Sequence, residues 1–162
     1  MAIVPLAVDL IAKVKELLLL GEPYIGVRTD SDYWLYASLF SSTCPVLLDD
    51  DGSVIGIVIA FRSQDNPDDI YVQDVMVHPS QRGRDVSADL LREVTRIAAG
   101  WGCRRLYLTS EPENEPAARA WHKLGFVNVP GDLVQHGVQV ITDFKGPGKH
   151  RAVYELILSH TE

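Results

Sequence analysis

The spacing of apolar residues predicts one helix near the start of the chain and a second soon after it. Apolar side chains recur at helical spacing through residues 6–20, and a glycine and a proline then end the pattern. The segment TDSDYWLYASLF, residues 29–40, predicts the second helix. Thr29, Asp30 or Ser31 can cap it, because each can accept hydrogen bonds from the free amides of the first turn.

Strands and helices alternate through the rest of the chain. An Asp-Asp-Gly turn, which supplies the positive φ that a tight turn needs, predicts a hairpin over residues 45–48 and 53–61. A helix begins at Asn114, with Pro116 in its first turn and Gly125 at its end. The other predicted elements are an apolar strand over 70–77, a helix over 86–99, a strand over 105–109, and two closing strands within 138–144 and 152–159.

This order of elements predicts an α/β (α+β) fold. We expect a mixed, mostly antiparallel twisted sheet of six to seven strands with helices on both faces. The strands over 70–77 and 105–109 should be parallel, because a helix connects them. A length of 162 residues fits a single domain spanning residues 1–162.

Composition and charge exclude several classes of function. Fifteen basic residues against 22 acidic ones give a net charge of −7, which argues against a nucleic-acid partner and favours cationic ligands. No apolar stretch approaches the roughly 18 residues needed to cross a bilayer, and charged residues interrupt the N-terminal apolar segment. We therefore expect no membrane association and no signal peptide. Cys44 and Cys103 have no spacing typical of a metal site, so reduced thiols and a cytoplasmic location are expected.

The histidines give no indication of a metal site. None of them shows the paired spacing that is typical of metal ligands. We expect each to be a surface or turn residue, and no metal to be bound. They are His78, His122, His136, His150 and His160.

The turn between the strand over 70–77 and the helix over 86–99 is a candidate phosphate site. The segment VMVHPSQRGRDVSADLL leads from a strand through a basic, glycine-containing turn into a helix. Such a turn brings unpaired backbone N–H groups and the positive end of the helix dipole together, which suits a pyrophosphate. Arg82 and Arg84 add side-chain charge. Taken alone, the segment is equally compatible with a purely structural turn.

Together with the later segment NEPAARAWHKLGF, this turn resembles the GNAT family of N-acetyltransferases. The family turn is Q/R-x-x-G-x-G/A, which corresponds to residues 82–87, and the family helix is N-x-x-A-x-x-F-Y-x-x-x-G-F. The resemblance extends from about residue 46 to residue 158 and implies the GNAT fold, with acetyl-CoA as the cofactor. The cofactor-binding residues that it implies are Val75, Met76, Val77, Gln81, Arg82, Gly83, Arg84, Asp85, Val86, Ser87, Asn114, Ala117 and Trp121.

The chain departs from the family pattern at three of these positions. Asp85 and Ser87 replace the two small residues of the turn. We expect Asp85 to cap the helix with its carboxylate turned outward, because a carboxylate beside a pyrophosphate would repel it. Trp121 replaces a tyrosine whose hydroxyl can protonate the departing thiolate. An indole N–H has no usable acidity, so Trp121 either packs on the cofactor or is a core aromatic residue.

The resemblance also implies direct attack of an amine on the thioester, with a backbone N–H of the strand over 70–77 stabilising the oxyanion. Gln73 and Asp74 correspond to a Glu-Asp pair of related diamine and polyamine acetyltransferases. Gln73 cannot accept a proton, so Asp74 is the expected base or counter-ion, and a structural carboxylate is the alternative. Both can face the amine only if the strand has a bulge, which the family carries there. Tyr71 either lines the acceptor pocket or packs on the sheet.

A narrower resemblance concerns the acceptor. Bacterial diaminobutyrate acetyltransferases have N-S-x-Y-x-Y before their second helix. Asp30, Ser31 and Tyr33 match the first four positions, with Asp for Asn at 30, and Tyr36 lies one residue beyond the second tyrosine of the pattern. Asp30, Tyr33 and Tyr36 are candidates for substrate binding, although Asp30 taken singly is better explained as a helix cap and a solvated acid. Gln73 replaces an aromatic residue of that group, so this substrate is not assigned.

We therefore expect an acetyl-CoA-dependent N-acetyltransferase that acts on the primary amine of a small, cationic molecule in a ternary complex. Lys145 and Lys149 either bind a substrate carboxylate or are solvated. One alternative is a GNAT-fold domain that has lost catalysis and senses CoA, which the changes at Asp85 and Trp121 would suit. The other is an enzyme that acetylates a protein N-terminus or lysine. A homodimer is left open.

Overall fold

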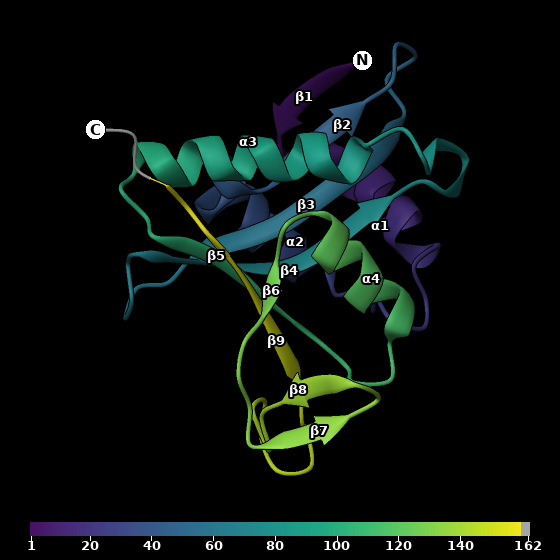
Figure 1. Ribbon diagram of the computed structural model, residues 1–162. Helices are drawn as coiled ribbons and strands as arrows, with labels where there is room; N and C mark the ends of the chain where they lie inside the picture. Colours follow the sequence, from purple (N-terminus) through teal and green to yellow (C-terminus); the bar gives the residue numbers. More distant parts are fainter. Residues whose placement is uncertain (160–162) are drawn as a thin grey trace.

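The computed structural model describes residues 1–159 (Figure 1). Its helices are α1 (Ile11–Leu19), α2 (Asp30–Leu39), α3 (Val86–Gly100) and α4 (Glu115–Lys123). Its strands are β1 (Ala2–Pro5), β2 (Pro45–Leu48), β3 (Val54–Arg62), β4 (Asp69–Val77), β5 (Arg105–Ser110), β6 (Val127–Asn128), β7 (Leu133–Gln135), β8 (Val138–Val140) and β9 (Ala152–Ile157).

The main sheet has seven strands in the order β1-β2-β3-β4-β5-β9-β6. All neighbouring strands are antiparallel except β4 and β5, which α3 connects. The predictions of a mixed, mostly antiparallel sheet and of one parallel pair are therefore confirmed. β7 and β8 form a separate two-stranded hairpin that lies beside the start of β9 (Figure 1).

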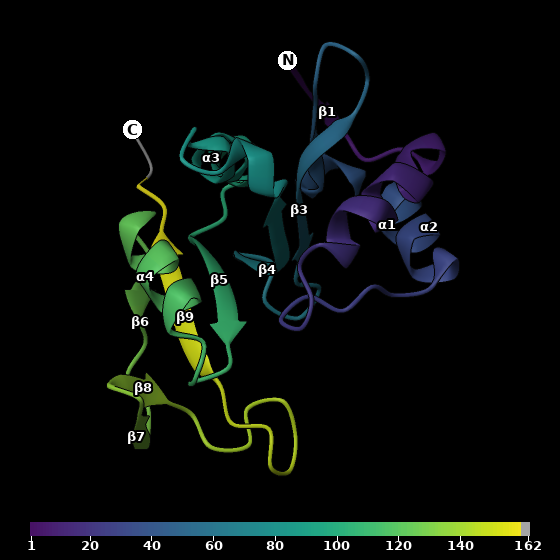
Figure 2. The ribbon, with the colours of Figure 1, turned by 90° about the vertical axis from the view of Figure 1, so that its right-hand side faces the viewer.

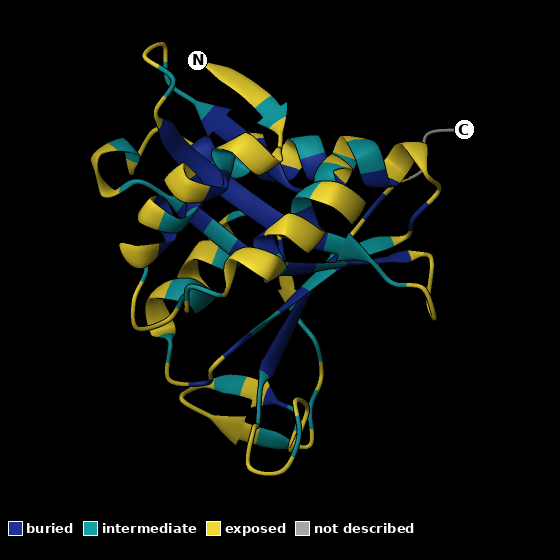
Figure 3. Ribbon diagram, turned by 180° about the vertical axis from the view of Figure 1, so that it is seen from behind, coloured by how far each residue is buried: buried dark blue, intermediate teal, exposed yellow. Residues whose placement is uncertain are grey.

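Helices cover both faces of the sheet, as predicted, and Figure 2 shows α1 and α2 on one side with α3 and α4 on the other. One core cluster joins α1 and α2 to the sheet, and the second joins α3 to the opposite face. β3 is buried along most of its length, because its residues contact helices on both sides (Figure 3). Gly56 allows α3 to approach β3 closely: a Cβ there would lie 2.9 Å from Leu90 Cδ1 and 3.0 Å from Val86 Cγ1.

The N-terminal helix predicted over residues 6–20 is shorter than expected. The edge strand β1 precedes it, a 3-10 turn forms over Val8–Leu10, and α1 begins only at Ile11. Apolar spacing does not separate these states, because β1 is held by its antiparallel pairing with β2, a contact distant in sequence. The strand predicted within 138–144 likewise ends at Val140. β1, β6 and β7 were absent from the prediction.

β4 and β5 separate soon after they begin. They pair at three positions only, Asp69 with Arg105, Ile70 with Leu106 and Tyr71 with Tyr107. Beyond Tyr71, the edge of β4 that faces β5 carries no strand pairing among residues 1–159. Figure 2 shows the two strands diverging from this point. The divergence leaves this edge of β4 without a strand partner between the two helical layers.

Candidate active site

The expected bulge is present in β4, at Gln73. In the ladder with β3, Asp74 pairs with Ile59 and Val72 pairs with Ala60, so Gln73 is the extra residue. Val72 belongs to the core beneath α3, whereas Met76 belongs to the core beneath α1 and α2. The bulge thus shifts the alternation of side chains, and Asp74 faces α1 and α2 together with Gln73.

Asp74 is a buried carboxylate with one cationic partner. Its side chain is 8% exposed, and Asp74 Oδ2 accepts a hydrogen bond of 2.9 Å from Nη1 of Arg28. Burial raises the pKa of Asp74, and the charge and hydrogen bond of Arg28 offset part of the rise. A buried carboxylate can attract an ammonium ion, and a raised pKa makes it a stronger base toward the ammonium proton.

The start of α2 fixes the position of Arg28. Thr29 caps this helix in a capping box with Asp32, in which each side chain accepts a bond from the other residue's backbone N–H. The hydroxyl of Tyr33 accepts a hydrogen bond of 3.1 Å from the backbone N–H of Arg28. Tyr33 itself is fully buried, at 0% exposure. It therefore positions Arg28 rather than presenting a group to a bound molecule.

Two more tyrosines lie beside Gln73 and Asp74. The Nε2 atom of Gln73 donates a hydrogen bond of 3.3 Å to the hydroxyl of Tyr36. The hydroxyl of Tyr71 accepts a bond of 2.8 Å from Nζ of Lys145, and the Tyr71 ring packs against Tyr107 at a centroid distance of 5.2 Å. Residues from β4, α2 and the loop after β8 thus converge on one cluster.

Asp30 lies apart from this cluster. Its carboxylate is 80% exposed and forms an ion pair of 2.6 Å with Lys15 of α1. The capping role that was open to Asp30 belongs to Thr29. The described contacts of Asp30 therefore join α2 to α1, and none of them reaches Asp74.

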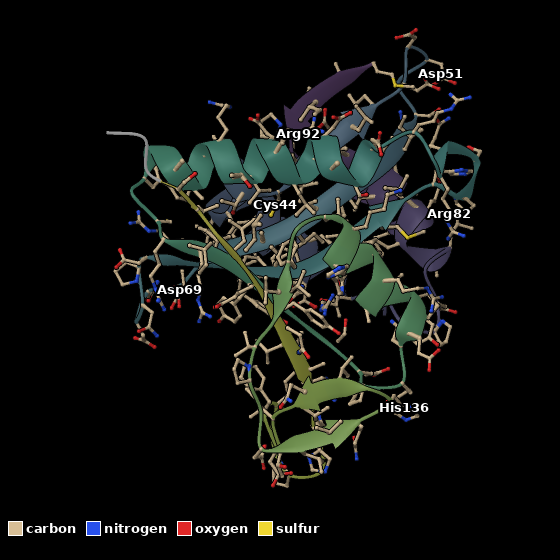
Figure 4. All side chains as sticks on the ribbon, viewed as in Figure 1. Cys44, Asp51, Asp69, Arg82, Arg92 and His136 are labelled. Atoms are coloured by element: carbon tan, nitrogen blue, oxygen red, sulfur yellow. The ribbon has the colours of Figure 1, made fainter. Side chains whose placement is uncertain are left out.

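The basic turn after β4 borders a shallow depression of about 210 Å³ that α4 closes on its other side. Gly83 has a φ of +82°, and no heavy atom lies within 4 Å of a Cβ built on it, so the backbone there is open to a bound group. Figure 4 shows Arg82 pointing outward from this turn. The lining residues are Val77, Gln81, Arg82, Gly83, Asp85, Val86, Ser87, Ala120, Lys123 and Leu124.

Asp85 does not cap α3, contrary to prediction. It occupies the N-cap position with a left-handed φ of 57°, and its side chain makes no capping hydrogen bond. Asp85 is exposed, and it also lines the depression. The amides of Val86, Ser87 and Ala88 precede the first hydrogen bond of the helix and have no capping side chain, so they can donate to an anion. With the open backbone at Gly83 and the nearby cations, these residues fit a diphosphate.

α4 is built as predicted. The side chain of Asn114 accepts a hydrogen bond of 3.2 Å from the N–H of Ala117, and Gly125 ends the helix with a φ of +93°. Nε1 of Trp121 donates a bond of 2.9 Å to Oγ of Ser110 at the end of β5. The half-buried Trp121 thus anchors α4 to β5, close to the point where β4 and β5 diverge.

Three residues of these surroundings were missed in the sequence: Arg28, Lys123 and Ser110. Arg28 directly precedes the helix cap Thr29 and belongs to no recognisable motif. Nothing in the nearby sequence indicates its ion pair with Asp74. Lys123 is the last residue of α4, two positions after Trp121. A helical projection of α4 could have placed Lys123 at the depression. Ser110 ends an apolar strand and could be found only through its contact with α4.

The cysteines and histidines lie outside this cluster. Cys44 and Cys103 are free and buried, as Figure 4 shows for Cys44, and burial raises the pKa of the Cys44 thiol to about 12. No group of three or more potential metal ligands occurs within residues 1–159, and His160 falls outside that range. Of the helices that the structure describes, none is both long and apolar enough to span a membrane.

Comparison with known proteins places most of the chain in one group. A family model described as the acetyltransferase (GNAT) family matches residues 14–126. L-2,4-diaminobutyric acid acetyltransferase of Chromohalobacter salexigens is 29% identical over 93 residues, which are 57% of this chain and 48% of that protein. The enzyme of the same name from Nocardia farcinica is 33% identical over 88 residues, 54% of this chain and 45% of that protein. The chain thus spans about half the length of these curated relatives.

Solved structures show the same fold. Diaminobutyrate acetyltransferase EctA from Paenibacillus lautus, in complex with L-2,4-diaminobutyric acid and coenzyme A, superimposes with a TM-score of 0.76 at 18% identity, covering 99% of this chain and 96% of that one. Ard1 from Thermoplasma volcanium gives a TM-score of 0.76 at 15% identity, covering 98% of both chains. At these identities the likeness concerns the fold alone.

Proposed function

Because the chain belongs to the GNAT family of acetyltransferases, we propose that it is an acetyl-CoA-dependent N-acetyltransferase acting on the primary amine of a small, cationic acceptor. Bound acetyl-CoA supplies the acetyl group as a thioester. The observation that carries the proposal is Asp74, a buried carboxylate that the bulge in β4 turns toward the cluster beside α2. The curated relatives named for diaminobutyric acid support an acceptor that is a small amine.

In this proposal Asp74 holds and deprotonates the acceptor. An amine reacts only when its lone pair is free, whereas a primary amine is mostly ammonium at neutral pH. Asp74 attracts the ammonium and accepts its proton, directly or through one water molecule. Its burial, which raises the pKa, makes it a stronger base than an exposed aspartate. Gln73 and Tyr36, which are joined by a hydrogen bond, form the adjoining wall of the proposed acceptor site.

The basic depression is the proposed cofactor site. Arg82, Arg84 and Lys123 supply positive charge, and the amides that open α3 supply hydrogen-bond donors for the diphosphate. Trp121 cannot act as an acid, and its N–H already bonds Ser110, so we assign it to positioning α4.

The proposal is tested by measuring thiol release from acetyl-CoA with a panel of acceptors, together with calorimetric binding of CoA. We expect turnover with small diamines or diamino acids and little with peptides. CoA binding without turnover on any amine would support the sensing alternative, which the pairing of Asp74 with Arg28 also favours. Turnover restricted to peptides would indicate a protein N-acetyltransferase. No binding of CoA or acetyl-CoA would overturn the proposal.

A further inference from the structure

Two nearby residues of β4, Asp74 and Tyr71, each contact a cationic side chain from a segment far away in the sequence. Arg28 comes from the loop before α2, and Lys145 comes from the loop between β8 and β9. In Figure 2 this second loop curls beneath the ends of β5 and β9. Lys145 reaches back to Tyr71 of β4, and its charge, like that of Arg28, lowers the pKa of Asp74 against the effect of burial. Both cations therefore lie beside the same stretch of β4, residues 71–74.

Both cations keep the capacity to bind a further anion. Arg28 has five N–H donors and gives one to Asp74, while its side chain remains 36% exposed. Lys145 donates to the neutral hydroxyl of Tyr71 and lies 5.4 Å from the centroid of that ring. Among residues 1–159 it forms no ion pair. Each can thus bind an anion brought by a ligand.

The balance of charge decides which acceptor suits this surface. The two cations outnumber the one carboxylate of Asp74, because the nearby acids Asp69 and Glu155 form ion pairs with Arg105. The net charge of this group is therefore positive. A diamine or polyamine would bring only positive charge, and the two cations would repel it. A diamino acid brings an ammonium for Asp74 and a carboxylate for the cations.

We propose that Arg28 and Lys145 bind the carboxylate of the acceptor, and that the acceptor is therefore an amino acid with a second, acetylatable amino group. This inference rests on the proposed function, since it concerns the same site. Arg28 is suited to the role because its planar guanidinium can bond Asp74 and the ligand carboxylate together. Lys145 adds a point charge on an exposed loop, and it sets which molecules are selected rather than how fast they react.

The test compares 2,4-diaminobutyrate with 1,3-diaminopropane, which differs only in lacking the carboxylate. We expect the wild-type protein to prefer the diamino acid by about tenfold or more in kcat/KM. Lys145→Gln should raise KM for the diamino acid about tenfold with little change in kcat, and should leave KM for the diamine unchanged or lowered. Arg28→Lys keeps the charge beside Asp74 but loses the planar fork, so it should act in the same direction.

Lys149→Gln is the matched control, because Lys149 is an exposed lysine of the same loop whose side chain forms no ion pair within residues 1–159. It should leave both acceptors unaffected. A second measurement, independent of turnover, is the rise in Tm that each acceptor causes in the presence of CoA, which Lys145→Gln should diminish for the diamino acid only.

Equal use of the two acceptors, or a Lys145→Gln effect common to both, would overturn the carboxylate assignment while leaving the proposed function in place. An effect of Lys149→Gln as large as that of Lys145→Gln would also overturn it. Absence of turnover on any amine would instead remove the proposed function itself.

Discussion

At the scale of single residues, Asp74 combines burial, a cationic partner and a position on the bulge of β4. Asp74→Asn keeps the shape but removes the charge and the proton acceptor. We expect it to lower kcat/KM by about two orders of magnitude or more, because general base catalysis commonly contributes that much. In wild type, kcat/KM should fall as the pH is lowered through the raised pKa of Asp74, since the protonated carboxyl cannot accept a proton. Steady-state rates of thiol release at several pH values measure both effects.

Asp30→Asn provides the control for Asp74→Asn. Asp30 is an exposed carboxylate at the start of α2 whose described partner is Lys15. Its substitution should leave kcat/KM within about twofold of wild type, as for surface changes away from a site. A large loss with Asp30→Asn would restore Asp30 to the acceptor site, and an unchanged rate with Asp74→Asn would remove Asp74 from the mechanism.

The same burial has a consequence for stability. Because burial raises the pKa of Asp74, the folded protein binds a proton there more tightly than the unfolded chain does. Stability from this group is therefore present at low pH and is lost as the pH rises through the raised pKa. Asn does not titrate, so the Asp74→Asn variant does not lose this stability as the pH rises. The difference in free energy of unfolding, variant minus wild type, should therefore increase from about pH 4 upward. Urea unfolding across this range tests it. A constant difference would mean that Arg28 compensates for burial completely.

At the scale of elements, the turn before α3 places a carboxylate beside the proposed diphosphate site. Asp85 lines the basic depression and has a φ of 57°. Asp85→Asn removes the charge and keeps a side chain that tolerates this φ. We expect CoA to bind about three- to tenfold more tightly at low salt, with the difference disappearing near 1 M salt, where charges are screened. Calorimetry with Asp85→Gly should give the same direction.

Asp89→Asn is the control for the turn. Asp89 lies one turn further along α3 and is paired with Arg92. CoA affinity should not change with this substitution. Equal affinity in wild type and Asp85→Asn would mean that the Asp85 carboxylate points too far outward to act on the diphosphate.

The packing of α3 on β3 depends on Gly56. A methyl group there would meet Val86 and Leu90 at about 3 Å, closer than carbon atoms normally approach. Gly56→Ala should therefore lower the free energy of unfolding by about 1–3 kcal/mol. Gly100→Ala, at the open end of the same helix, meets nothing within 4 Å and should raise it by about 0.5–1 kcal/mol. Thermal unfolding measures both variants. Opposite changes in stability would show that close packing at Gly56 is the cause, whereas equal changes would indicate a general effect of an added methyl group.

How far the sequence predicts these elements depends on the range of the interactions that form them. Local signals predicted α2 with a cap among Thr29, Asp30 and Ser31, the hairpin of β2 and β3, and α4 between Asn114 and Gly125; the structure identifies Thr29 as the cap. The bulge at Gln73 was expected from the family resemblance and is present. β1 and β6 were missed because short strands depend on neighbours distant in sequence. The Asp85 cap was wrong because Asp85 has a left-handed backbone, whereas a capping residue typically has an extended one.

At the scale of the whole molecule, the site joins segments that no local pattern connects. Arg28, Asp74 and Lys145 stand on three separate segments and meet only because the sheet brings β4 between α2 and the loop after β8. The sequence indicated Asp74, and for Lys145 it allowed either binding of a substrate carboxylate or a solvated side chain. It gave no signal for Arg28. Pairing between distant charges is a property of the folded chain, so a single sequence does not reveal it.

The two candidate sites lie on opposite sides of the sheet. The basic depression lies between the turn after β4 and α4, whereas the Asp74 cluster faces α1 and α2. β4 contributes Val77 to the depression and Asp74 to the cluster, so the proposed function allows both reactants to be bound at once. A covalent acetyl-enzyme on a thiol is disfavoured, because Cys44 and Cys103 are buried and burial raises the pKa of both.

We therefore expect direct transfer in a ternary complex. Initial rates measured against acetyl-CoA at several acceptor concentrations should give intersecting double-reciprocal lines, and a conjugate of CoA with the acceptor amine should bind more tightly than either reactant alone, since it spans both sites at one entropic cost. Parallel lines, or an acetylated protein isolated after incubation with acetyl-CoA alone, would contradict this. The conjugate also separates the sites: Asp74→Asn should weaken its binding toward that of CoA itself, whereas Asp85→Asn should strengthen the binding of both.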